Sequence, residues 1–239
     1  MPRIVEIGDI VRQGRTEPIL CRADDGCEYV VKGRYAGNKA IISEWVANRL
    51  GATLGIPIPP FCLLDVPSEF FGFGAMDEKL SRLGRGPVFG SRLVPNVVEL
   101  RHTDIESIDL ALRARVLAYD LWIANSDRVF VNGVGNPNLL WDEREQKLVV
   151  IDHNLAFEPE IMGDFLGEHA FRGAASIWSD AFKSAVAAEF RAALSDLQGI
   201  WNELPEEWLE VDCGITFPSV EALLWKFDRD PASFWNLTQ

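Results

Sequence analysis

The sequence predicts an α+β fold of two lobes, a small one rich in strands and a larger one that is mainly helical. The order of the elements is the first reason, because strand patterns come first along the chain and helical patterns later. Size and composition are the second, since 239 residues with 48% hydrophobic side chains can bury a core. The length suits one two-lobed domain as well as two small ones, and we expect the small lobe over residues 1–90 and the large lobe over 91–239.

The small lobe opens with strand patterns. They are apolar around single charges or alternate with β-branched residues, as half-buried strands do. Asp24-Asp25-Gly26 separates two of them and is typical of a hairpin turn. A polar loop with one glycine, Gly14, separates the first two. The predicted strands are 4–7, 18–23 and 27–33.

A helix is expected next, over 41–50, because its apolar side chains recur with a period of 3.6 residues. Gly51 and Gly55 lie at or beyond its end, and Pro57 prevents its continuation. A short strand at 61–64, an irregular insertion rich in Gly and Phe at 67–86, and a strand at 87–93 that ends at a linker complete this lobe.

The large lobe begins with a long helical pattern from Ile105 to about Asn125. A loop over 126–137 leads into two short strands around a charged turn. An irregular stretch follows, and the remainder is helical and carries several tryptophans, which we expect in the core. The expected ranges are 138–141 and 147–151 for the strands, 152–173 for the irregular stretch, and 176–199 and 219–227 for the helices.

The formal net charge of −13 is unevenly distributed. Residues 1–90 hold 11 basic and 11 acidic side chains, whereas residues 91–239 hold 12 basic and 25 acidic ones, so 12 − 25 gives the whole net charge. Nucleic acid and anionic membranes would be repelled by the second half, and neither is expected as a partner. The acidic half can also serve solubility alone.

Two further features indicate a cytoplasmic protein without a membrane span. The longest uncharged run, 50–64, contains three prolines, and the first ten residues carry two acids and no apolar core of a signal peptide. The four cysteines form no Cys-x-x-Cys pair and, with three histidines, no zinc spacing. We expect their thiols to be free.

Two acids and an amide stand on loops at the edges of the predicted hairpin. Asp127 lies in Asn125-Ser126-Asp127-Arg128, Asn138 opens the first strand and Asp152 follows the second. Phosphoryl transfer needs such a set, because one carboxylate orients the attacking hydroxyl while an amide oxygen and a second carboxylate hold Mg²⁺ on the phosphates. Strand ends are rigid enough to keep these oxygens at fixed separations.

A cation and an acid stand upstream in the small lobe. Lys32 ends a predicted strand, and Glu44 lies on the helix that follows. A lysine is a point charge suited to phosphate oxygens, and a carboxylate on a helix can hold it in place. The loop around Gly14 can close over phosphates with its backbone N–H groups.

Taken in order, these segments resemble the HipA-like kinases, especially their short single-domain branch, and more distantly the phosphoinositide and protein kinases. The resemblance covers roughly residues 10–160 and implies a two-lobed, protein-kinase-like fold that binds ATP and Mg²⁺ between its lobes, with the adenine near Phe89 to Leu93. It implies Ser or Thr of a protein as the phosphate acceptor. The matching segments are 29–33, 43–50 with the Gly-Ile-Pro turn at 55–57, 125–128, 136–140 and 151–153.

In this resemblance Asp127 is the catalytic base or hydroxyl orienter, Lys32 holds the phosphates, Glu44 holds Lys32, and Asp152 binds the metal. Which asparagine joins Asp152 stays open, because the loop after Asp127 is longer than the family usually has. Asn132 follows Asp127 by five positions, the protein-kinase interval. Asn138 opens a strand, and Asn136 precedes a proline; we expect Asn138 first and Asn136 next.

Other functions remain open from the sequence. The single glycine at the phosphate loop and the lengthened catalytic loop favour a pseudokinase that binds nucleotides or other proteins. A lipid or small-molecule acceptor, or a kinase toxin with a bound protein inhibitor, is also compatible. Arg128 is expected to pair with an acidic loop, and His153 to be structural and to bond the hairpin backbone.

Overall fold

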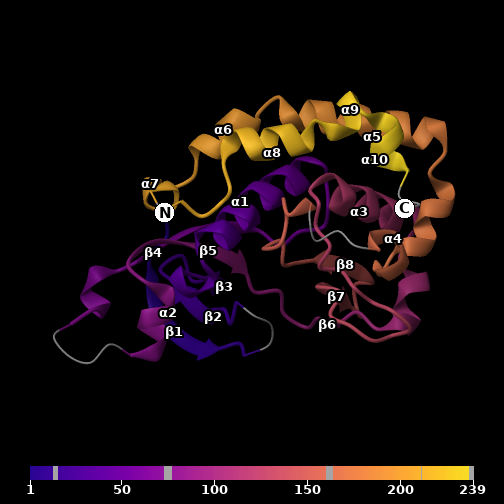
Figure 1. Ribbon diagram of the computed structural model, residues 1–239. Coiled ribbons are helices and arrows are strands. Elements are labelled where there is room, and N and C mark those ends of the chain that lie inside the picture. Colours follow the sequence, from indigo (N-terminus) through magenta and orange to yellow (C-terminus); the bar gives the residue numbers. More distant parts are fainter. Residues whose placement is uncertain (13–15, 73–76, 160–163, 211, 237–239) are drawn as a thin grey trace. The chain divides into compact units, whose positions relative to one another are not determined.

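The computed structural model describes residues 1–12, 16–72, 77–159, 164–210 and 212–236 (Figure 1). The chain forms two compact units. The sheet unit contains Met1–Trp45, Pro59–Pro95 and Leu204–Cys213, and the helical unit contains Val46–Ile58, Asn96–Glu203 and Gly214–Gln239. The predicted α+β class is confirmed, while the lobes over 1–90 and 91–239 stay a prediction.

The sheet unit is built on a five-stranded antiparallel sheet in the order β1-β2-β3-β5-β4 (Figure 1). The predicted strands are confirmed, and the Asp24–Gly26 turn closes the β2–β3 hairpin, with Gly26 at φ +80°. Side chains such as Ile19, Val31 and Leu64 form its core and are at most 1% exposed. The strands are β1 (Ile4–Ile10), β2 (Ile19–Ala23), β3 (Glu28–Lys32), β4 (Phe61–Val66) and β5 (Gly86–Arg92).

Helix α1 (Asn38–Thr53) is longer than its pattern predicts, because Gly51 lies inside it rather than at its end. A Cβ on Gly51 would come within 2.4 Å of Ile58 and 3.0 Å of the Tyr119 hydroxyl. The glycine therefore serves close packing within the helical unit, where the Tyr119 hydroxyl donates to the Ala47 carbonyl at 2.6 Å. The turn beyond the helix is at Gly55, with φ +69°.

The insertion expected to be irregular over 67–86 contains a short 3-10 helix, η2 (Ser68–Phe70), and a helix, α2 (Glu78–Leu83). Six residues are too few to show a helical period, but the Asp77 carboxylate caps α2 by accepting from the Lys79 N–H at 3.2 Å. The end of α2 packs on the backbone just after β3, where a Cβ on Gly33 would lie 2.3 Å from the Leu83 carbonyl oxygen.

In the helical unit, the long pattern from Ile105 resolves into a 3-10 helix, η3 (His102–Ser107), and helix α3 (Leu110–Trp122). Asp109 starts α3, because its carboxylate accepts from the Leu112 N–H at 3.0 Å. The helix ends at Trp122, before the predicted Asn125, since Ala124 takes a left-handed backbone with φ +49°.

The predicted hairpin is confirmed as β7 (Leu139–Asp142) and β8 (Lys147–Val150), with Leu139 opposite Val150. A third strand, β6 (Val98–Glu99), pairs with β7 and was not predicted, because two residues carry no alternation to detect. The antiparallel order is β6-β7-β8.

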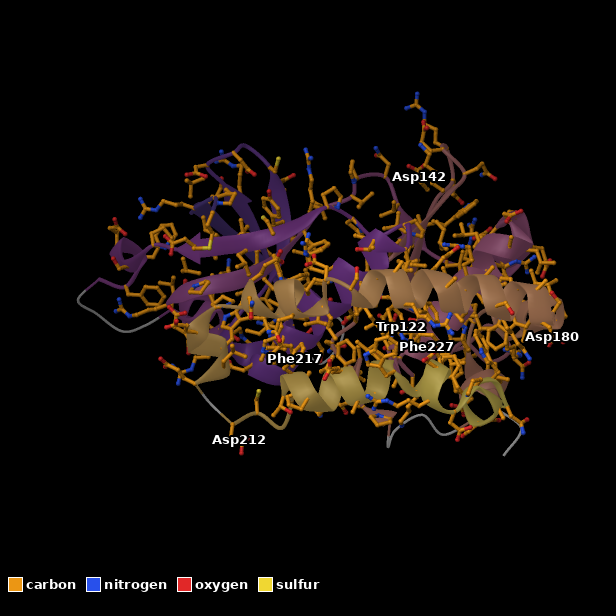
Figure 2. All side chains as sticks on the ribbon, turned by 90° about the horizontal axis from the view of Figure 1, so that it is seen from above. Trp122, Asp142, Asp180, Asp212, Phe217 and Phe227 are labelled. Carbon is orange, nitrogen blue, oxygen red and sulfur yellow. The ribbon has the colours of Figure 1, made fainter. Side chains whose placement is uncertain are left out.

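Short helices and aromatic packing complete both units. In the helical unit, the Trp122 ring stacks on Phe190 at 4.1 Å between centroids. It also meets Phe227 edge-on at 6.4 Å, and both of these rings are labelled in Figure 2. Trp208 of α7 belongs to the sheet unit, where its indole N–H donates to the Pro87 carbonyl at 3.0 Å. Among the described residues, no helix is long and apolar enough to cross a membrane.

The remaining helices are α4 (Phe165–Glu168), α5 (Asp180–Leu194), α6 (Leu197–Asn202), α7 (Glu206–Leu209), α8 (Phe217–Leu224), α9 (Lys226–Arg229) and α10 (Pro231–Trp235), with 3-10 helices η1 (Arg34–Ala36) and η5 (Arg172–Ile177).

Candidate functional site

In the sheet unit, the structure brings Lys32 and Glu44 together as predicted. Lys32 is the last residue of β3 and Glu44 lies in α1, and their side chains form a buried ion pair. Lys32 is 6% exposed and Glu44 is 2% exposed. Removing a charge from water is costly unless an opposite charge compensates it, so each side chain makes the burial of the other tolerable.

The two residues expected near the adenine have different surroundings. Phe89 lies opposite Lys32 in the β3–β5 pairing, so the two side chains share a face of the sheet. The Phe89 ring is 2% exposed and packs near Phe61, with 6.1 Å between ring centroids. The Leu93 N–H donates to the Glu28 carbonyl at 2.8 Å, so this N–H is already used within the protein. Gly14 lies outside the described residues.

In the helical unit, Asp127 and Asn138 are in direct contact. The amide nitrogen of Asn138 donates to both the backbone oxygen and Oδ2 of Asp127, each at 2.9 Å. Neither bond uses the amide oxygen of Asn138. Asn138 is 6% exposed, whereas Asp127 is half-buried. The contact therefore orients the Asp127 carboxylate from an almost fully buried residue.

Asp152 follows the second strand of the same hairpin, two residues after the end of β8. The Ile151 N–H donates to the Asn138 carbonyl at 3.1 Å, which makes Asp152 and Asn138 near neighbours beyond the paired ends of β7 and β8. Both take a left-handed backbone, with φ +58° at Asp152 and +51° at Asn138. Such conformations are unfavourable for residues other than glycine, and they concentrate at functional sites.

The extra residues of the loop form a turn of their own. Val131 and Val134 exchange backbone hydrogen bonds at 2.9 and 3.0 Å, and between them Asn132 and Gly133 have φ +53° and +81°. Two positive φ values are typical of a type I′ turn, which the Asn-Gly pair favours. Asn132 is thus exposed at the tip of a turn. Asn136 is also exposed, and its side-chain oxygen accepts from the Asn138 N–H at 3.3 Å.

The sequence predicts that Arg128 pairs with an acidic loop, and this prediction is wrong. Its partner is Asp120 of α3: Nε donates to Oδ2 at 2.7 Å, and both side chains are fully buried. Nη1 donates to the Asn138 and Ile151 carbonyls at 2.9 Å each and to the Pro137 carbonyl at 3.4 Å. The acid comes from a buried helix instead, and the spacing of residues in the sequence does not reveal that this helix packs against Arg128.

Sequence reasoning missed Asp120 altogether. It is also bonded by the Asn125 amide nitrogen at 2.9 Å and by His169 Nε2 at 3.2 Å. Burial alone would raise the pKa of Asp120, but the Arg128 charge and the His169 hydrogen bond outweigh it and lower the pKa to about 2. The available signal was that Asp120 is the single charged residue in the run from 116 to 124.

His153 is buried, and its Nε2 lies 2.8 Å from Nη2 of Arg128. The structure thus gives His153 the Arg128 guanidinium as a partner, in addition to an edge-on ring contact with Tyr119 at 5.7 Å. Since an arginine has only donors, Nε2 of His153 accepts this bond. His153 therefore helps to fix the same guanidinium that reaches the two hairpin ends.

The donor set around the hairpin fits a magnesium ion. Within the described part of the chain, no three His, Cys, Asp or Glu side chains form a metal cluster. Mg²⁺ is usually held by one or two carboxylates together with substrate phosphates and water, and it prefers oxygen ligands. The Asp152 carboxylate and the Asn138 amide oxygen are oxygen donors of this kind, on residues joined through the Ile151 N–H and the Asn138 carbonyl.

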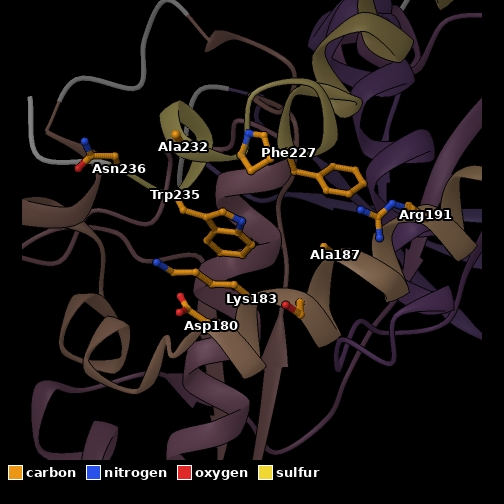
Figure 3. A pocket seen from close by; sticks show the side chains of 10 residues that line it. Asp180, Lys183, Ala187, Arg191, Phe227, Ala232, Trp235 and Asn236 are labelled. Carbon is orange, nitrogen blue, oxygen red and sulfur yellow. The ribbon is translucent and has the colours of Figure 1, made fainter.

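One open groove of about 690 Å³ lies elsewhere in the helical unit, between α5, α9 and α10 (Figure 3). Lys183 and Trp235 line it, with the Lys183 ammonium 6.0 Å from the Trp235 ring centroid. Arg191, also on the groove, is paired with Asp228 at 2.6 Å. The groove shares no residue with the site around Asp127.

Solved structures with a similar fold include the proinflammatory kinase CtkA of Helicobacter pylori. The match covers 97% of this chain and 94% of that chain, with a TM-score of 0.58 and 12% sequence identity. This likeness confirms the predicted kinase-like fold. The complete CtTel1 dimer and the FAT and kinase domain of CtTel1 also match, each over 94% of this chain at 15% identity and TM-score 0.33, over 11% and 21% of those chains.

No curated protein matches the sequence. The sequence model of the family described as HipA-like kinase, however, matches residues 4–238, nearly the whole chain. This match extends the predicted resemblance through the C-terminal helices, where no motif was apparent. The chain belongs to the HipA-like kinase family.

Proposed function

We propose that the chain transfers the γ-phosphoryl group of ATP to a Ser or Thr hydroxyl of a protein, with Mg²⁺ on the phosphates. Membership of a kinase family supports the reaction class. The observation that carries the residue roles is the pair of 2.9 Å bonds by which the Asn138 amide holds Asp127. They join the expected hydroxyl orienter to the expected metal ligand.

Asp127 orients the acceptor hydroxyl. One of its carboxylate oxygens accepts from Asn138, so the carboxylate has a fixed direction in which to accept the proton of an incoming hydroxyl. In phosphoryl transfer little covalent chemistry is left to the protein, and positioning of the nucleophile is a main contribution. A residue held from a buried strand end suits that task.

Asp152 and the amide oxygen of Asn138 would hold Mg²⁺. When bound, the ion neutralises the charge that develops on the phosphate oxygens. The left-handed backbone at both residues supports this role, because it is an unfavourable conformation maintained at two adjacent hairpin ends. Asn136 is the second choice, since its side chain is exposed and engaged with the Asn138 N–H.

Lys32 contributes a positive charge for the phosphates, and Glu44 holds it in place. The ammonium is buried and paired, so its position is set by packing as well as by charge. A pre-organised cation loses little conformational freedom when it binds a phosphate oxygen. The Phe89–Leu93 segment is our choice for adenine contact through its backbone.

The test is transfer of labelled phosphate from ATP to protein, lipid and small-molecule acceptors by the wild type and two variants. Asp127→Asn should lose turnover but retain ATP binding, because the carboxylate does not hold the nucleotide. Asp142→Asn is the control, since Asp142 stands at the opposite end of the hairpin and caps its turn by accepting from Arg144 and Glu145 (Figure 2).

The outcomes separate the candidate functions. Transfer to protein Ser or Thr that is lost in Asp127→Asn and kept in Asp142→Asn supports the proposal. Transfer only to a lipid or small molecule changes the acceptor. ATP binding without transfer to any acceptor and without hydrolysis makes the chain a pseudokinase.

A further inference from the structure

We propose that Arg128, held by Asp120, is a positioning residue that fixes both metal-binding ends of the hairpin together with the neighbouring Asp127. The inference rests on the proposed function for its catalytic meaning. It concerns residues outside the proposed catalytic and metal-binding set, and the sequence predicted for Arg128 only an ion pair with an acidic loop.

A single guanidinium reaches both ends of the hairpin. Its Nη1 donates at 2.9 Å to the carbonyl of Asn138, just before β7, and at 2.9 Å to that of Ile151, just after β8. Asp152 follows Ile151 directly, so the residues proposed to hold Mg²⁺ are linked through one nitrogen. Arg128 also follows Asp127 in sequence, which ties the hydroxyl orienter to the same group.

Asp120 secures both flanks of Asp127. On one side it accepts from Arg128 Nε at 2.7 Å, and on the other from the Asn125 amide at 2.9 Å. The oxygen of the Asn125 side chain lies 3.5 Å from the Asp127 N–H. A fully buried carboxylate on the last turns of α3 thus anchors the segment before and after the catalytic residue.

Only an arginine can make this set of contacts. Its planar guanidinium presents five donors in a rigid fork, and here they face a carboxylate, an imidazole and carbonyls from two chain segments. A lysine keeps the charge but offers one compact donor group. The left-handed backbone at Asn138 and Asp152 requires such over-determination, because it is unfavourable by itself.

The test compares Arg128→Lys with Arg113→Lys. Arg113 is a matched control: it is also buried, at 8% exposed, and is paired twice with an acid, Glu106. Hydrogen exchange is measured by mass spectrometry on the full chain without ligand, over 136–142, 148–154 and α5. Phosphate transfer is then measured against Mg²⁺ concentration at saturating ATP.

Arg128→Lys should speed exchange in 136–142 and 148–154 but not in α5, and should raise the Mg²⁺ concentration for half-maximal transfer by about tenfold or more. Arg113→Lys should leave both hairpin segments and the Mg²⁺ requirement as in the wild type. Unchanged hairpin exchange in folded Arg128→Lys, or equally faster exchange throughout the chain, would overturn the positioning role.

Two further results are decisive. If Arg128→Lys yields no folded protein, Asn125→Ala is used, because it removes a hydrogen bond to Asp120 and the one from the Asp127 N–H without leaving a buried charge unpaired. Faster exchange over 136–142 and 148–154 is then expected, because Asp120 holds Arg128 less firmly, and its absence overturns the inference. If the wild type transfers no phosphate, the proposed function fails, while the exchange comparison still tests the role of Arg128.

Discussion

The amide nitrogen of Asn138 lies 2.9 Å from Oδ2 of Asp127 and 2.9 Å from its backbone oxygen. One side chain thus holds the residue proposed to orient the acceptor hydroxyl, and both bonds leave its amide oxygen for the proposed role as a metal ligand. Asn132, which has the protein-kinase spacing, lies instead at the exposed tip of a turn. The two candidates differ enough in their surroundings for mutation to separate them.

We expect Asn138→Ala to raise the Mg²⁺ concentration for half-maximal phosphate transfer by about tenfold or more, since it removes a proposed metal ligand. It should also lower kcat at saturating Mg²⁺, because Asp127 loses its partner. Asn132→Ala should change neither quantity appreciably, and Asn136→Ala should have a smaller effect than Asn138→Ala. A larger effect from Asn132→Ala would mean that the turn takes part in metal binding.

Variants of the Lys32–Glu44 pair should change the free energy of unfolding and the affinity for ATP separately. Glu44→Gln leaves a buried ammonium beside a neutral amide, and breaking a buried pair on one side costs about 3–5 kcal/mol. The double change Lys32→Met with Glu44→Leu should recover most of this stability, because apolar replacements of similar volume are tolerated there. Its affinity for ATP should nevertheless remain lower than that of the wild type, because the Lys32 charge is gone.

Urea unfolding and an ATP titration measure the two quantities. Lys79→Met with Asp9→Leu is the control, because that pair is exposed on the Asp9 side and joined at 3.5 Å. It should alter neither unfolding nor ATP binding by much. If the double variant at Lys32 and Glu44 binds ATP like the wild type, Lys32 does not hold the phosphates.

Local patterns were sufficient to predict the strands of the sheet unit, because alternation and the Asp-Gly turn act over a few residues. The elements that escaped prediction are shorter than any period: β6 has two residues and α2 has six. Their existence depends on partners, such as Leu140 opposite Glu99 and the backbone after β3 beneath Leu83.

The candidate site divides in the same way. Asp127, Asn138 and Asp152 stand within ordered motifs, so a reader of the sequence finds them. Asp120 and His169 are separated by 49 residues and meet only in the folded chain. No spacing rule joins them, and a buried acid in an apolar helix was the single available indication.

The loop between Asp127 and Asn138 should not tolerate a side chain at Gly135. Its φ is +132°, and a Cβ there would lie 2.2 Å from the Val129 carbonyl oxygen. Gly135→Ala should therefore lower the melting temperature by several degrees and reduce transfer, because the backbone must shift. Gly173→Ala is the control, since a Cβ on Gly173 meets nothing within 4 Å. Equal melting temperatures for the two variants would contradict the close approach of Gly135 to the Val129 carbonyl.

The buried His169 predicts how stability depends on pH. Burial lowers its pKa below the usual 6.5, although the Asp120 carboxylate acts in the opposite direction. The Phe171 N–H donates to Nδ1 at 2.9 Å, so Nδ1 carries no proton and the neutral ring donates from Nε2 to Asp120. Protonation would place a second cation beside Arg128 in a fully buried network.

Below pH 6.5 the unfolded chain therefore binds a proton at His169 that the folded chain resists, so the free energy of unfolding falls as pH falls from about 6.5. Asp120 adds a loss of stability in the same direction at lower pH, between 3.8 and about 2.

His169→Gln retains a side-chain N–H for Asp120 but cannot titrate. Urea unfolding at pH 7.5, 6.5 and 5.5 should show a shallower decline for His169→Gln than for the wild type. His102→Gln, a change at a solvent-exposed residue, is the control and should decline like the wild type. Parallel curves for the wild type and His169→Gln would mean that His169 is charged in the folded chain.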